Sequence, residues 1–105
     1  MSISSLNGKV GVVTGGGQGI GKGIVKRLLE EGMSVVIAEI DKQAGLEAES
    51  QLKILGSVFF VQTDVRDESS VKSCVDSTIQ KFGHLDGRVN TTLDRRFIPH
   101  ISLKF

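Results

Sequence analysis

The chain of 105 residues carries a net charge of +1 with acidic and basic residues mixed along it, so it can form one small domain and offers no extended basic surface for nucleic acid. No segment resembles a secretory signal, and none is apolar for long enough to span a membrane. The single cysteine, Cys74, cannot form an internal disulfide, and we expect a soluble cytoplasmic protein with neither nucleic-acid nor membrane partners.

Short apolar runs alternate with segments of helical periodicity. The runs at residues 9–13, 34–38 and 57–61 are continuous, which predicts strands that are buried on both faces, as in a parallel sheet. Helices are predicted where apolar residues recur at helical spacing, over residues 20–31, 44–55 and 68–82. This alternation is typical of an α/β fold with right-handed crossovers and helices on both faces of the sheet.

Helix-ending residues support these assignments. The first helix is expected to bury an apolar face that begins at Ile20, and Gly32 ends it. Gly56 is expected to end the second helix. Asp67 is predicted to cap the third helix at its start and Gly83 to end it.

The turn after the first strand is rich in glycine, and residues 14–21 read Thr-Gly-Gly-Gly-Gln-Gly-Ile-Gly. Such a turn between a buried strand and a helix lets backbone N–H groups approach a phosphate, and the positive end of the helix faces that anion. A nucleotide cofactor is therefore predicted. A nucleoside-triphosphate loop overlaps the motif from Gly16 to Lys22, but Gly23 stands where that loop needs a hydroxyl ligand for magnesium. A tight turn that binds no ligand is the third interpretation.

Carboxylates follow the second and third predicted strands. Glu39 lies about 20 residues beyond the glycines, which is the spacing of an acid that hydrogen-bonds an adenosine ribose. Its charge would repel a 2′-phosphate, which favours NAD over NADP. Asp41 competes for this role, although it is better placed to cap the second helix. Asp64 could accept a hydrogen bond from an adenine amino group or cap a turn.

These motifs, together with Phe-Gly-His-Leu-Asp at residues 82–86, resemble the short-chain dehydrogenase/reductase superfamily over residues 6–86, and more loosely to residue 90. The resemblance implies a partial Rossmann-like, doubly wound parallel sheet of about four strands, β-α-β-α-β-α-β, in the order 3-2-1-4. It implies hydride transfer between NAD and an alcohol or carbonyl. The residues it assigns to the cofactor are Gly15, Gln18, Gly19, Ile20 and Gly21 around the pyrophosphate, Glu39 at the ribose, Asp64 and Val65 beside the adenine, and Asn90.

The resemblance weakens at the predicted fourth strand. Gly87 and Arg88 stand where the family has apolar residues, and burying an unpaired arginine there would be unfavourable. The family continues with Asn-Asn-Ala-Gly, of which only Asn90 keeps its place. We therefore expect an NAD-binding half-domain in residues 1–90 and a divergent C-terminal tail in residues 91–105.

The chain contains no tyrosine. In the family a Tyr, assisted by a Lys four residues later, transfers the proton at the carbonyl oxygen. We therefore expect no catalytic residue in this chain and no activity from it alone. The alternative is a non-catalytic nucleotide-binding or interaction module, whose exposed sheet edge would allow self-association or pairing with a full-length relative. His84 is predicted at the surface and Cys74 as a buried, inert thiol, and neither they nor His100 suggest a metal site.

Overall fold

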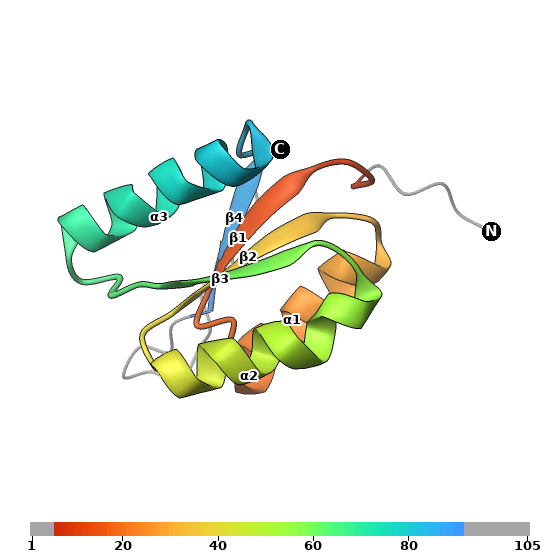
Figure 1. Cartoon of the computed structure of the whole chain (residues 1–105), viewed down its shortest axis with the longest axis horizontal. Coiled ribbons are helices and arrows are strands. Elements are labelled where there is room, and N and C mark those ends of the chain that lie inside the picture. Colours follow the sequence, from red (N-terminus) through yellow and green to blue (C-terminus); the bar gives the residue numbers. More distant parts are fainter. Residues whose placement is uncertain (1–5, 92–105) are drawn as a thin grey trace.

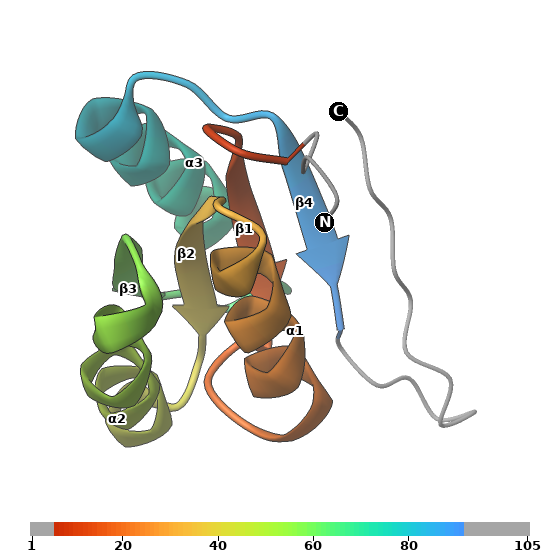
Figure 2. The same cartoon turned by 90° about the vertical axis from the view of Figure 1, so that its right-hand side faces the viewer.

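The computed structural model describes residues 6–91 and contains one four-stranded parallel sheet in the order β3-β2-β1-β4 (Figures 1 and 2). The strands are β1 (Val10–Thr14), β2 (Ser34–Glu39), β3 (Val58–Gln62) and β4 (Gly87–Asn90). The helices are α1 (Gly19–Glu30), α2 (Lys42–Leu52) and α3 (Glu68–Phe82), and the 3-10 turn η1 (Lys53–Leu55) follows α2. The predicted partial Rossmann-like α/β fold and its strand order are confirmed.

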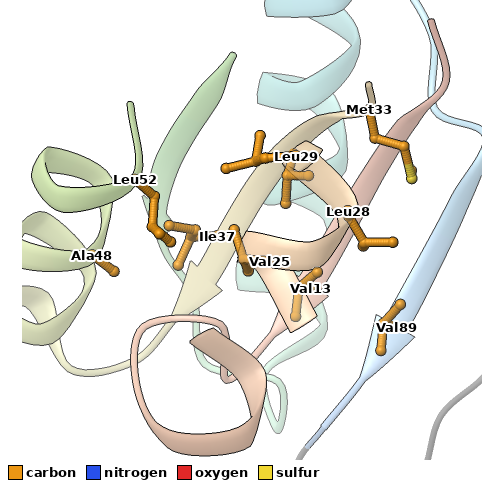
Figure 3. Close-up of a cluster of buried hydrophobic side chains, with 10 residues drawn as sticks. Val13, Val25, Leu28, Leu29, Met33, Ile37, Ala48, Leu52 and Val89 are labelled. Atoms are coloured by element: carbon orange, nitrogen blue, oxygen red, sulfur yellow. The ribbon is translucent and has the colours of Figure 1, made fainter. Parts of the chain in front are cut away.

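Helices cover both faces of the sheet, α1 and α2 on one side and α3 on the other (Figure 1). Because successive side chains of a strand point to opposite faces, Val13 of β1 packs toward α1 and α2 while Val12 packs toward α3. Figure 3 shows the larger of these two apolar clusters, which consists of Val13, Val25, Leu28, Leu29, Met33, Val35, Ile37, Ala48, Leu52 and Val89. Burial on both faces explains why the strand sequences are apolar without alternation.

The predicted caps of the helices are present. Asp41 accepts a hydrogen bond from the Ala44 N–H (3.1 Å) at the start of α2, and Asp67 accepts one from the Ser69 N–H (2.9 Å) at the start of α3. Gly83 ends α3 in the left-handed region (φ 89°), which favours glycine. Asp41 therefore serves as a helix cap, which leaves Glu39 as the carboxylate at the end of β2.

Two predictions about the helices are wrong. Ile20 does not belong to the buried face of α1, since it is 58% exposed and lies at the edge of the glycine turn. The second helix ends at Leu52 rather than at residue 55, because the chain tightens there into η1 and leaves Ile54 exposed. Apolar spacing alone did not distinguish these exposed positions from buried ones.

Arg88 lies in β4 without being buried. It pairs in register with Val12 of β1, and its side chain is exposed while its neighbours Gly87 and Val89 are buried. The unfavourable burial expected for this arginine is thus avoided, because the described residues leave that part of β4 uncovered. Residues 92–105, which include most of the predicted tail and His100, lie outside the described residues.

Cys74 is buried and His84 is exposed, as the sequence predicted. Cys74 is buried under the sheet, and desolvation raises the pKa of its thiol, against smaller opposing effects of hydrogen bonds to Thr63 and Thr78. A raised pKa keeps the thiol protonated and unreactive. His84 is exposed, with Nε2 2.9 Å from Oδ2 of Asp86.

Candidate functional site

The glycine-rich turn joins the carboxyl end of β1 to α1. Gly15 (φ +66°) and Gly19 (φ +56°) occupy the left-handed backbone region, where residues with a Cβ are strained. The Gly15 N–H donates to the carbonyl of Ala38 in β2 (2.8 Å), which fixes the start of the turn to the neighbouring strand. The turn is therefore a defined backbone structure that depends on glycine.

The amino-terminal end of α1 comes very close to the turn. A Cβ on Gly21 would lie closer than 3.0 Å to the carbonyl oxygen of Gly15, so only glycine allows this approach. Within the described residues, Gln18 stands before the helix in an extended conformation and makes no side-chain capping bond. The first N–H groups of an α-helix have no intrahelical acceptor, and together with the helix dipole they favour an anion. The amino-terminal end of α1, with Gly19 leaving open space beside it, thus fits a phosphate group.

Glu39 ends β2 directly beside this turn and is only 4% exposed. Its Oε1 accepts a hydrogen bond from the Gly17 N–H (3.0 Å), and its Oε2 accepts one from the Asp41 N–H (3.1 Å). A carboxylate oxygen has more than one lone pair, so each oxygen can accept a further hydrogen bond from a ligand hydroxyl. The sequence predicted the position of this acid but not its contact with the turn.

Asp64 follows β3 and is paired with an arginine that the sequence did not single out. Its Oδ1 accepts hydrogen bonds from the Arg66 N–H (3.0 Å) and Nε–H (3.1 Å), and its Oδ2 accepts one from Nη2 (3.2 Å). The side-chain hydrogen bond to Arg66 holds the pKa of Asp64 below its ordinary value. The carboxylate is therefore ionised at neutral pH and its orientation is fixed.

Replacing Arg66 with alanine is expected to raise the pKa of Asp64 back toward its ordinary value. The ion pair stabilises the folded state above the pKa that Asp64 has in the unfolded chain, and this contribution is lost as the pH falls through the lowered folded pKa. Because Arg66 is highly exposed, the stability effect is small and decreases with salt. An NMR titration of the Asp64 carboxyl carbon measures the shift, with Lys72→Ala as control. An unchanged Asp64 pKa in the Arg66 variant would contradict the assignment.

Hydrogen bonds join the end of β4 to Thr14, at the start of the glycine turn. The Thr14 hydroxyl contacts Oδ1 of Asn90 (2.9 Å) and accepts a hydrogen bond from the Thr91 N–H (3.2 Å), while the Thr91 hydroxyl donates to the Thr14 carbonyl. A Cβ on either Gly15 or Gly21 would lie closer than 3.0 Å to Thr91 Oγ1. Thr91 thus lies against the glycine turn, although no motif in the sequence selects it.

A cavity of about 580 Å³ lies where these elements meet, a size typical of ligand sites. It brings together eight of the nine predicted site residues: Gly15, Gln18, Gly19, Ile20, Gly21, Glu39, Asp64 and Val65. Asn90 is absent from the described lining, and its Oδ1 accepts a hydrogen bond from the Thr14 hydroxyl (2.9 Å). The lining residues that the sequence missed are Ala38, Ile40, Thr63, Arg66 and Thr91. Among residues 6–91 we find neither a cluster of three metal-ligating side chains nor a helix that could cross a membrane.

Comparisons with known proteins agree with this geometry. An uncharacterized oxidoreductase of Thermotoga maritima is 56% identical over 86 residues, which cover 81% of this chain and 34% of that protein. The L-fucose dehydrogenase of Bos taurus is 47% identical over 83 residues, covering 79% of this chain and 30% of that protein. A short-chain dehydrogenase/reductase of Burkholderia phymatum, solved in complex with NAD, superimposes with a TM-score of 0.79 at 31% identity, covering 83% of this chain and 31% of its own.

The similarities cover most of this chain but only part of each relative. It spans about a third of the length of the curated relatives it matches. The family model of the short chain dehydrogenases matches residues 9–93, which extends past residue 90, where the motifs themselves stop. Because this match includes every described strand and helix, the chain belongs to the short-chain dehydrogenase family.

Proposed function

We propose that the chain is the NAD(H)-binding part of a short-chain dehydrogenase/reductase, whose reaction is hydride transfer between NAD and an alcohol or carbonyl. The observation that carries this proposal is the cavity in which the glycine turn, Glu39 and Asp64 meet at the carboxyl ends of parallel strands. The NAD complex of the similar Burkholderia phymatum protein supports the choice of cofactor.

Each part of the cavity has a role in this proposal. Backbone N–H groups at the amino-terminal end of α1 hold the diphosphate, whereas the N–H groups of Gly15 and Gly17 are engaged by Ala38 and Glu39. Glu39 accepts hydrogen bonds from the adenosine ribose, and its charge disfavours the 2′-phosphate of NADP. Asp64 and the exposed side chain of Val65 flank the adenine. When bound, NAD supplies the nicotinamide ring that accepts or donates the hydride.

We further propose that the 105-residue polypeptide has no dehydrogenase activity by itself. Its sequence contains no tyrosine, so the proton-transfer group that the family uses is not available within it. Another polypeptide would have to supply that group for turnover. The alternative is a non-catalytic module that binds the nucleotide and takes part in no turnover even when a full-length relative is present. Turnover assays with and without a full-length relative distinguish the two possibilities.

Isothermal titration calorimetry of the purified chain tests nucleotide binding. We expect NADH and ADP-ribose to compete for one site and NADP to bind more weakly than NAD. ATP with magnesium should bind no more tightly than ADP-ribose, because Gly23 offers no hydroxyl ligand for the metal. Absence of saturable heat with NADH, from a sample whose circular dichroism shows a folded protein, would contradict the proposal. Measurable alcohol oxidation would contradict only the proposed inactivity.

Self-association or pairing with a longer relative is proposed at the outer edge of β4. In the described part of the chain β4 has one neighbouring strand, β1. The opposite edge is less suited to pairing, because Glu49 of α2 accepts a hydrogen bond from the Phe60 N–H of β3 (2.7 Å). Analytical ultracentrifugation over a range of concentrations should detect dimers, and a single monomeric species throughout would contradict self-association.

The boundary between an NAD-binding half-domain in residues 1–90 and a tail in residues 91–105 stays a prediction, as does a cytoplasmic location.

A further inference from the structure

We propose that Glu39 is a positioning residue for the phosphate-binding turn as well as a ribose acceptor. This inference rests on the proposed NAD-binding function and adds a second role for the same carboxylate. Glu39 connects the turn to α2, since one oxygen binds the Gly17 N–H and the other binds the Asp41 N–H immediately before that helix. Removing the carboxylate therefore changes the site for the diphosphate, even for a ligand without ribose hydroxyls.

The packing around Gly17 shows how closely the turn is held. Gly17 is buried, and a Cβ on it would lie 2.8 Å from Cγ of Glu39 and 3.1 Å from the backbone nitrogen of Gly45 in α2. Gly45 in turn lies against the ring of Phe60 in β3, which occupies the space of a Cβ. The middle of the turn is thus enclosed between the end of β2 and the first turn of α2.

The hydrogen bond at Gly17 is significant because it is buried and its acceptor is charged. Hydrogen bonds to an ionised acceptor are stronger than neutral ones, and leaving a buried N–H without an acceptor is strongly unfavourable. Without Glu39 the Gly17 N–H loses this acceptor, and the turn loses its side-chain link to the end of β2 and the start of α2. A turn freed in this way shifts the neighbouring residues Gly19 and Gly21, which line the cavity. Ribose recognition and diphosphate binding are therefore coupled through one side chain.

Hydrogen exchange at the Gly17 amide in the unliganded protein tests the contact directly. In Glu39→Ala this amide should exchange at least about tenfold faster than in the wild type. Glu39→Gln keeps one acceptor oxygen and should retain most of the protection. Glu47→Gln removes the same charge from an exposed position of α2 and should leave the rate unchanged. Equal Gly17 exchange in the wild type and Glu39→Ala would overturn the inference, whatever nucleotide the protein binds.

Binding of ADP and of 2′,3′-dideoxy-ADP separates the two roles of Glu39. If the carboxylate contacted only the ribose, Glu39→Ala would bind the dideoxy compound as well as the wild type does, and this result would overturn the inference. We expect the variant to bind dideoxy-ADP about fivefold or more weakly, with recovery in Glu39→Gln. If the wild type bound neither compound, the proposed function would fail, and the exchange measurement alone would decide the positioning role.

Discussion

Replacing Gly21 with alanine is expected to weaken NAD binding strongly and to destabilise the domain. The new Cβ would lie closer than 3.0 Å to both the Gly15 carbonyl oxygen and Thr91 Oγ1. The carbonyl belongs to the backbone of the turn, so relief requires α1 and the turn to separate. Overpacking of this kind costs about 1–3 kcal/mol and lowers the Tm of a small domain by roughly 5–15 °C. Affinity for NADH should fall at least about tenfold, because the N–H groups facing the phosphates are displaced.

Gly23→Ala is the matched control for this prediction. Gly23 lies in the same helix, and no described atom is within 4 Å of the Cβ that alanine would add. The control should leave NADH affinity unchanged and stabilise α1 by about 0.5–1 kcal/mol, because alanine restricts the unfolded chain and favours helix. Calorimetry with thermal unfolding measures both properties. Unchanged stability and affinity in Gly21→Ala would show that the turn does not require this close approach.

Gly45→Ala is expected to have the second largest effect, although alanine is the better helix former. A Cβ on Gly45 would lie closer than 3.0 Å to several ring atoms of Phe60, which packs against the core from β3. Loss of this packing should exceed the gain in helix propensity and reduce the free energy of unfolding by about 1–2 kcal/mol. Denaturant unfolding measures the change, and Ser50→Ala at an exposed position of α2 is the control.

A double-mutant cycle assigns the effect of Gly45→Ala to the Phe60 ring. Phe60→Val removes the ring and keeps a residue that favours strands. In that background Gly45→Ala should cost about 1 kcal/mol less than in the wild type, since the overlapping atoms are gone. If the changes in unfolding free energy of the two substitutions were additive, the effect of Gly45→Ala would not arise from contact with the Phe60 ring.

The sequence was sufficient for the fold where one pattern satisfied several requirements at once. Continuous apolar strands, such as residues 34–38, are informative because a parallel sheet buries both faces. The caps at Asp67 and Gly83 were equally clear, because each involves the residue type that a helix end favours. Ile20 was assigned wrongly because helical spacing gives the face of a helix but not whether a ligand site or the core lies beside it.

The candidate site was predictable only where its residues belong to local motifs. The glycine turn and Glu39 have characteristic spacings along the chain, so the sequence identified them. Arg66 and Thr91 were missed because their roles arise from tertiary contacts, with Asp64 in one case and with Thr14 in the other. The buried contact between Glu39 and the turn was missed for the same reason, since its partner is a backbone N–H.

Titration of the nitrogen-15-labelled chain with NADH, followed by NMR, tests the central claim most directly. We predict saturable shift changes that are largest at the amides of Gly19 and Gly21 and extend to Asp64, the positions that line the cavity. A separate hollow on α2 is lined by Lys42, Gln43, Leu46 and Glu47, and shift changes confined to it would contradict the account. So would a spectrum of a folded protein that NADH leaves unchanged.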